Sequence, residues 1–167
     1  MMDLLFSPGG RINTHEFMKG AKILIAASLV LVLVRSINFQ LGTTLALLNV
    51  VMWWCWIVLW VKRYHDGGQS GWMCLIPIIV FNIVSTIFNQ IVFNMFADPE
   101  IRAAMKEAAA TGNFGAAMEA VMSSGGMSET GMLVSALGGA AISYAIAFLF
   151  NRAIRQEPSD NRFGPAS

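Results

Sequence analysis

The chain has 167 residues, of which 56% are hydrophobic and 13% are charged, and its net charge is +1. Soluble domains carry about a quarter charged residues, so this composition excludes an ordinary soluble domain and favours a protein embedded in a bilayer. The near-neutral net charge gives no reason to expect nucleic acid as a partner, and two cysteines exclude a disulfide framework.

Four apolar stretches are candidates to cross a bilayer, which takes about 20 residues of helix. The first has basic residues near its ends that can snorkel to the interfaces, and the second has four tryptophans in its C-terminal half, a position typical of the headgroup boundary. The third is long and must tilt, kink or project beyond the lipid. The predicted spans are residues 17–38, 41–61, 72–97 and 131–151.

A short helical segment is predicted between the third and fourth spans. Residues 98–100 read Asp-Pro-Glu, which is typical of a helix start, and Gly112 is expected to end that helix. A shorter helix is expected over Phe114 to Met122, and both should lie on the outer membrane surface as amphipathic helices within residues 99–122. Residues 158–167 form a polar tail that is expected to be extended or disordered.

The predicted fold is all-α: one membrane domain over residues 1–157, built as a four-helix transmembrane bundle. With the N-terminus inside, eight basic residues lie on the inner side, namely Arg11, Lys19, Lys22, Lys62, Arg63, Arg152, Arg155 and Arg162. Three lie on the outer side, namely Arg35, Arg102 and Lys106. Because basic residues concentrate on the cytoplasmic side of membrane proteins, both termini are predicted to be cytoplasmic.

The stretch "KRYHDGGQSGW", residues 62–72, separates two runs without any charge. We predict a tight cytoplasmic turn here, with its polar groups in water or among headgroups. Near the N-terminus, Asn13 and Glu16 have the spacing of a capping box for a helix that begins around Thr14. Glu16 is also expected to form an ion pair with Arg63 or Arg11, because a carboxylate at the interface needs a partner.

His65 and Asp66 allow several interpretations. The favoured one is structural, with both side chains bonding the turn to the N-terminal segment. As a catalytic pair they lack a nucleophile at a recognisable spacing, although Ser70 is nearby. A metal site would require His15 and Glu16 to meet them, and we expect neither metal nor cofactor. A further alternative is that Arg11, Lys62, Arg63 and the N–H groups of the loop bind the phosphates of lipid headgroups.

Small and polar residues mark two further helix faces. An amide-bearing face of the third span, with Asn82, Thr86 and Asn89, should turn inward; helix–helix hydrogen bonding is favoured there over a hydrated solute path. In the fourth span, small residues recur at every fourth position and predict close helix packing, within the chain or with another chain. This ridge consists of Gly131, Ser135, Gly139, Ser143 and Ala147.

Three segments carry a family resemblance. "FSPGGRINTHEF" is similar to the signature F-S-x-x-G-R-x-x-R-x-E-[FY], "KRYHDGGQSGW" to [KR]-R-x-H-D-x-G-x-S-G-W, and "DNRFGP" to the usual tail of the DUF805 family of small bacterial inner-membrane proteins. The resemblance implies a multi-pass helical protein without an established activity. Thr14 stands where the family usually has a basic residue, and residues 98–130 are longer than expected. The signature positions are Gly10, Arg11, Glu16, Phe17, Arg63, His65, Asp66, Gly68, Ser70, Gly71 and Trp72.

We therefore predict a non-enzymatic accessory or structural protein of the bacterial inner membrane. Its expected partners are membrane lipids, through their headgroups, and a membrane protein or further copies of itself. A small-solute or ion transporter is the first alternative, and a membrane-surface enzyme that uses His65 and Asp66 is the second. The candidate cytoplasmic cluster consists of Arg11, Glu16, Arg63, His65, Asp66, Ser70, Gly71 and Trp72.

Overall fold

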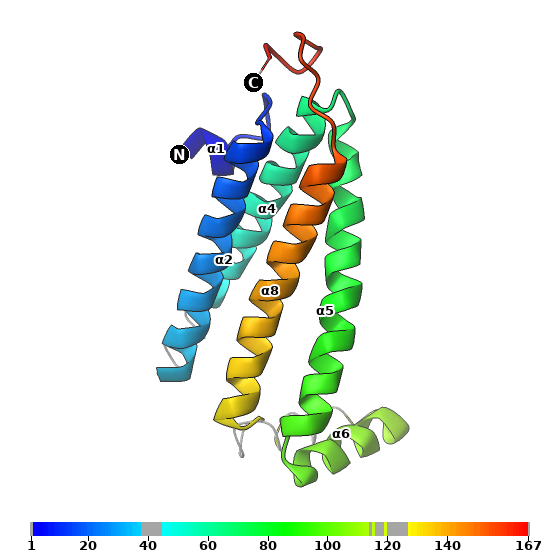
Figure 1. Cartoon of the computed structure of the whole chain (residues 1–167). Coiled ribbons are helices and arrows are strands. Elements are labelled where there is room, and N and C mark those ends of the chain that lie inside the picture. The colour runs from blue at the N-terminus through cyan, green and yellow to red at the C-terminus, as the bar shows by residue number, and fades with distance from the viewer. Residues whose placement is uncertain (1, 38–44, 114, 116–118, 120–126, 167) are drawn as a thin grey trace. The chain divides into compact units, whose positions relative to one another are not determined.

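The computed structural model describes residues 2–37, 45–113, 115, 119 and 127–166. Within these residues the structure is helical, and β pairing is confined to isolated bridges, so the all-α prediction is confirmed. The elements in chain order are α1 (Met2–Phe6), α2 (Thr14–Ile37), α4 (Ala46–Asp66), the 3-10 helix η1 (Gly71–Cys74), α5 (Leu75–Phe96), α6 (Pro99–Thr111) and α8 (Glu129–Ala153) (Figure 1).

Three stretches of helix among the described residues are long and apolar enough to cross a membrane: Thr14–Val34, Gly71–Phe96 and Glu129–Ala153. They correspond to the first, third and fourth predicted spans. The second predicted span coincides in part with α4, whose last turn is charged and whose preceding residues 38–44 lie outside the described part.

The predicted turn over residues 62–72 is wrong in its first half. Helix α4 continues to Asp66, and the chain reverses only between Gly67 and Ser70, before η1 begins. The expectation that the polar groups of this stretch lie in water or among headgroups is wrong for Lys62, Arg63 and Asp66, which are buried. Burial is possible here because these groups bind partners within the protein rather than solvent.

The chain divides into two compact units, residues 1–82 with 140–167 and residues 83–139. In the first unit α2, α4 and the C-terminal half of α8 run side by side (Figure 1). Phe17 and Trp60 are both buried in its core, with ring centroids 4.5 Å apart. A Cβ on Gly20 would lie 2.7 Å from Leu59, so glycine at this position allows α2 and α4 to approach closely.

The second unit contains the helix predicted after the third span. The Asp98 carboxylate accepts a 2.9 Å hydrogen bond from the Glu100 N–H, and Pro99 occupies the first turn of α6. Gly112 ends the helix with a left-handed φ of 75°, which confirms both predicted boundaries. The shorter helix expected over 114–122 falls mostly outside the described residues.

Candidate functional site

Asp66 lies at the centre of a buried ion-pair cluster in the first unit. Its Oδ1 atom is 3.2 Å from Nη2 of Arg11, and its Oδ2 atom is 2.9 Å from Nη1 of Arg63. The side chains of Asp66 and both arginines are at most 1% exposed. A carboxylate at the C-terminal end of a helix is unfavourable with respect to the helix dipole, so its stability here depends on the two guanidinium groups. We call these three residues the Arg–Asp cluster.

Arg63 connects this cluster to the C-terminal end of α8. Its Nη2 donates to the main-chain carbonyls of Asn151, at 3.0 Å, and Ile154, and its Nε donates to the Asn151 side chain. Such carbonyls at a helix end have no partner within the helix, so a cation there serves as a cap. Nη2 also lies 3.1 Å from the Thr14 hydroxyl at the start of α2. Burial lowers the pKa of Arg63, and Asp66 partly opposes this effect.

In the structure the chain after α8, residues 154–166, includes the predicted tail and is called the tail from here on. Arg11 connects the cluster to it. Its guanidinium donates to the carbonyls of Glu157 and Ser159, the latter at 2.7 Å, and the Glu157 N–H donates in turn to the Asp66 carbonyl at 2.9 Å. The expectation of an extended or disordered tail is therefore wrong. The tail folds back because it supplies the acceptors that the buried Arg11 requires.

His65 binds the N-terminal segment and the tail rather than the carboxylate beside it. Its Nδ1 lies 3.3 Å from the Gly10 carbonyl, which can only accept, so Nδ1 carries the proton. Its ring stacks on Phe163, with centroids 3.8 Å apart and an interplanar angle of 5°. Burial lowers the pKa of His65, the hydrogen bond to Gly10 raises it, and the nearby Arg162 lowers it further. These contacts agree with the structural interpretation of His65 and Asp66.

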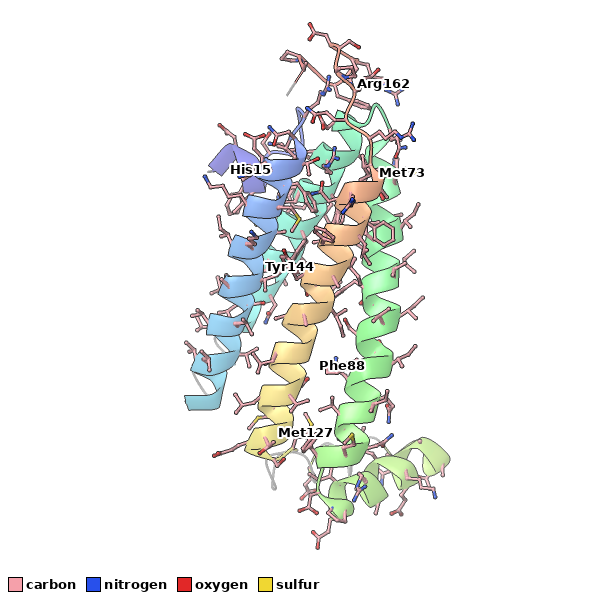
Figure 2. All side chains as sticks on the ribbon, in the orientation of Figure 1. His15, Met73, Phe88, Met127, Tyr144 and Arg162 are labelled. Carbon is pink, nitrogen blue, oxygen red and sulfur yellow. The ribbon has the colours of Figure 1, made fainter. Side chains whose placement is uncertain are left out.

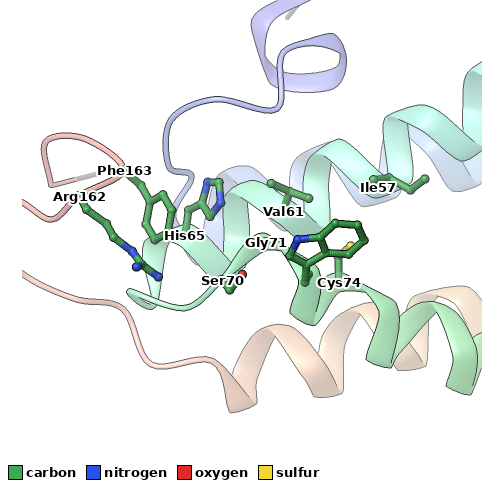
Figure 3. A pocket seen from close by; sticks show the side chains of 9 residues that line it. Ile57, Val61, His65, Ser70, Gly71, Cys74, Arg162 and Phe163 are labelled. Carbon is green, nitrogen blue, oxygen red and sulfur yellow. The ribbon is translucent and has the colours of Figure 1, made fainter.

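A cavity of about 600 Å³ opens beside His65 (Figure 3). It lies between the C-terminal half of α4, the start of η1 and the tail, and it is shallow and open to the outside. Its lining is largely apolar, and its polar side chains include those of His65, Ser70 and Arg162. The lining residues are Ile57, Val61, His65, Ser70, Gly71, Trp72, Cys74, Arg162 and Phe163.

Of the two contacts predicted for Glu16, the structure shows the capping contact with Asn13 and not the ion pair. Its backbone N–H donates to the Asn13 side chain at 2.9 Å, so Asn13 caps α2 at the predicted position. The predicted ion pair from Glu16 is wrong, because Asp66 is the carboxylate that both arginines bind. Asp66 is the last residue of α4 and lies close to Arg11, near the N-terminus, and to Glu157 in the tail. Glu16 is exposed on the first turn of α2.

The remaining predicted residues of the cytoplasmic cluster lie around the cavity. A Cβ on Gly71 would be 3.0 Å from both Nε2 of His65 and the Val61 side chain, so a larger residue would displace them. Ser70 is exposed, and Trp72 is 79% exposed. Both therefore face outward, and neither side chain belongs to the Arg–Asp cluster.

Part of the small-residue ridge contacts α5 in the second unit. The Ser135 hydroxyl donates to Oδ1 of Asn89 at 2.6 Å, and a Cβ on Gly131 would lie 2.5 Å from Phe96. The next predicted ridge residue is Gly139, but the glycine that packs closely against α5 is its neighbour Gly138. A Cβ on Gly138 would lie 2.0 Å from Phe88, which Figure 2 labels on α5. A Cβ on Gly139 would meet nothing within 4 Å. In the first unit, Ser143 is half-buried and Ala147 is buried.

The amide face of α5 does not turn inward as predicted. Asn82, Thr86 and Asn89 are exposed in this chain. The Asn82 side chain donates to the Ile78 carbonyl of its own helix at 2.8 Å, and Asn89 accepts from α8. The predicted helix–helix hydrogen bonding is therefore present at Asn89, whereas Asn82 bonds to its own helix.

The metal interpretation had required His15 and Glu16 to meet His65 and Asp66. Among the described residues, no three His, Cys, Asp or Glu side chains are close enough together to hold an ion.

Two contributors to the site carried too little signal for sequence analysis to find. Asn151 accepts from Arg63 and donates to the Thr14 carbonyl at 3.1 Å, but it reads in the sequence as an ordinary residue at the end of a span. Phe163 lies in the "DNRFGP" segment, whose family resemblance marked the tail without indicating its contact. Neither partner can be deduced from local spacing, because each contact joins segments far apart in the chain.

Comparison with known proteins gives one match. A family model described as "Protein of unknown function (DUF805)" matches residues 5–165, nearly the whole chain. No curated protein and no solved structure matches it.

Proposed function

This chain belongs to the DUF805 family of proteins of unknown function, and we propose that it is a non-enzymatic accessory protein of the bacterial inner membrane. In this proposal it crosses the bilayer four times, has both termini in the cytoplasm, and binds lipid headgroups or a membrane partner there. The observation that carries the proposal is the burial of Asp66 between Arg11 and Arg63.

The contacts of Arg11 support an even number of crossings. Arg11 precedes α2 and binds carbonyls of the tail that follows α8, so both lie on the same side of a bilayer. It also binds Asp66 at the end of α4. If α2, α5 and α8 cross, α4 must cross as well to bring Asp66 back to Arg11. Helix α4, Ala46–Asp66, would then supply the fourth span, with its charged last turn beyond the lipid.

The distribution of charge supports a cytoplasmic location for this end. Eight of the eleven basic residues lie on the Arg11 side of the predicted spans, against three on the other side. Basic residues favour the cytoplasmic side of bacterial membrane proteins. Those that are exposed on this side are free to meet anionic lipid: Lys19, Lys22, Arg152, Arg155 and Arg162.

The ion pairs of the Arg–Asp cluster favour an accessory role over catalysis. Both guanidinium groups are directed at acceptors within the chain, and the contacts of His65 and Asp66 go to different partners. Asp66 therefore does not orient His65 in the way that a catalytic base is oriented. The cluster instead ties the start of α2, the end of α4, the end of α8 and the tail into one assembly.

The proposal is tested by purifying the full chain in mild detergent and identifying the bound lipid by mass spectrometry. We expect anionic phospholipid to remain bound. The same protein, reconstituted into liposomes loaded with K⁺ and a small fluorescent dye, should release neither faster than protein-free liposomes. Release of either solute by the protein alone, or loss of all anionic lipid on purification, would contradict an accessory, lipid-binding role.

A further inference from the structure

The cavity beside His65 has a polar end with positive charge. Arg162 is exposed, and its guanidinium carbon lies 4.6 Å from the centroid of the Phe163 ring, which is stacked on His65. Ser70 adds a hydroxyl. No carboxylate is among the lining residues of the described chain, so nothing in the lining offsets the positive charge of Arg162. The polar end is therefore complementary to an anion.

The other end of the cavity is apolar. Ile57 and Val61 lie one turn apart on α4, and Trp72 at the start of η1 supplies a large exposed ring. Tryptophan is enriched at the level of lipid headgroups, where its ring contacts both chains and polar groups. A free inorganic anion would leave this wall in water, whereas an amphiphile with acyl chains would cover it.

Because one face of the cavity is cationic and the other is hydrophobic, its complement is a molecule that carries both a negative charge and a hydrocarbon chain. We propose that this cavity binds a single phospholipid of net negative charge. Its phosphate lies against Arg162 and Ser70, and its acyl chain lies along Ile57 and Trp72. This assignment rests on the proposed function and adds to it one defined site and one lipid class.

His65 contributes to the shape of this site. With the Nδ1 proton directed at Gly10, Nε2 carries the lone pair, and it lies on the side of the ring that faces Gly71. Glycine at position 71 keeps this side of the cavity open, because any side chain would press on both His65 and Val61. The stack with His65 places Phe163, the chain neighbour of Arg162, at this end of the cavity.

The test is native mass spectrometry of the full-length protein in detergent, titrated with phosphatidylglycerol or phosphatidylcholine of identical acyl chains. We expect the first phosphatidylglycerol to bind more tightly than the first phosphatidylcholine. Arg162→Gln should raise the Kd for phosphatidylglycerol by about tenfold, the loss expected for one charge-assisted contact. It should weaken phosphatidylcholine less, because the choline cation of that lipid offsets the charge of its phosphate. The matched control is Arg155→Gln, which removes an exposed cation of the same tail that does not line the cavity.

A second variant tests the apolar wall. Ile57→Trp should fill the cavity and weaken binding of both lipids. Its thermal unfolding should match that of the wild type, which shows that the variant is folded and that the loss of binding comes from the filled cavity. A third arm adds inorganic phosphate at millimolar concentration, which should not displace the lipid.

Several results would overturn the site. Equal effects of Arg162→Gln and Arg155→Gln would mean that general surface charge attracts the lipid. Displacement by inorganic phosphate would mean that the site takes a free anion. A dimer whose dissociation follows lipid addition would mean that a second copy occupies the cavity. In each of these cases the proposed function still stands if the purified wild type retains anionic lipid. If the purified wild type retains no anionic lipid, both the cavity site and the proposed function are overturned.

Discussion

At the scale of single residues, Asp66 is the carboxylate that neutralises two buried guanidinium groups. Asp66→Asn would keep the size of the side chain and remove its charge, which leaves two buried guanidinium groups without a counterion. We expect the free energy of unfolding to fall by about 3–5 kcal/mol. The measurement is the unfolding transition in mixed micelles titrated with sodium dodecyl sulfate.

Glu16→Gln is the matched control for Asp66→Asn, because Glu16 is an exposed carboxylate of the same end of the protein. It should change the free energy of unfolding by less than about 0.5 kcal/mol. Equal effects of the two substitutions would show that the buried cluster adds nothing to stability beyond what a surface carboxylate adds.

Protonation of His65 should loosen the tail. Its pKa is lowered from the ordinary value of 6.5, mainly by burial, so the folded protein binds fewer protons than the unfolded chain just below that pH. Stability is therefore complete above pH 6.5 and decreases as the pH falls through the lowered pKa. Thermal unfolding compared at pH 7.5 and pH 5.5 should show a loss for the wild type that His65→Gln reduces.

His15→Gln serves as the comparison for this pH dependence. His15 is exposed on the first turn of α2, as Figure 2 shows, and its replacement should leave the wild-type pH dependence intact. If His65→Gln and the wild type lose stability equally on acidification, His65 is not the group responsible.

The sequence allowed the tie between His65 and the N-terminal segment to be predicted, but it did not allow the partner of the arginines to be chosen. Arg63 and Asp66 lie three residues apart on one helix, a spacing that permits an ion pair. Arg11 is 55 residues from Asp66, and only the fold brings them together. From the sequence alone, Glu16 was an equally plausible partner for the arginines. Burial decides between the two carboxylates, and burial cannot be read from local spacing.

At the scale of helices, adjacent glycines of α8 make a direct test of packing. A Cβ on Gly138 would lie 2.0 Å from Phe88, so Gly138→Ala must push the ring aside and should lower the free energy of unfolding by about 1–3 kcal/mol. A Cβ on Gly139 has open space, and Gly139→Ala should be neutral or should stabilise the helix by about 0.5–1 kcal/mol. The sodium dodecyl sulfate titration measures both; the reverse ranking would contradict this helix register.

Helix boundaries were predictable wherever the chain carries its own local signal. Asn13 and Asp98 each accept a hydrogen bond from the helix that they precede, and Gly112 ends α6. The small-residue ridge was predictable as a feature but not in register, because both Gly138 and Gly139 satisfy a small-residue pattern and only the position of Phe88 distinguishes them. The fold of the tail was not predictable, because a polar, proline-containing segment has no periodicity that reveals its acceptors.

At the scale of the whole chain, contacts at one end of the first unit support the proposed order of four crossings. The start of α2, the end of α4 and the tail after α8 all meet at the Arg–Asp cluster. Segments joined by hydrogen bonds cannot lie on opposite sides of a bilayer. Hydropathy alone leaves α4 ambiguous, since its last turn is charged. In the proposed topology α2 crosses the bilayer, and the buried ion pair then requires the end of α4 to lie on the side from which α2 departs.

This argument predicts the accessibility of single cysteines placed in a Cys55→Ala, Cys74→Ala background. Gln69→Cys, between α4 and η1, and Ala166→Cys, in the tail, should react with a membrane-impermeant maleimide only after the cells are permeabilised. Glu107→Cys on α6 is exposed and follows the third span, so it should react in intact cells. Reaction of Gln69→Cys and Ala166→Cys from opposite sides is impossible if Arg11 binds both Asp66 and the tail. That result would therefore reject the four-span topology together with the ion-pair cluster that requires it.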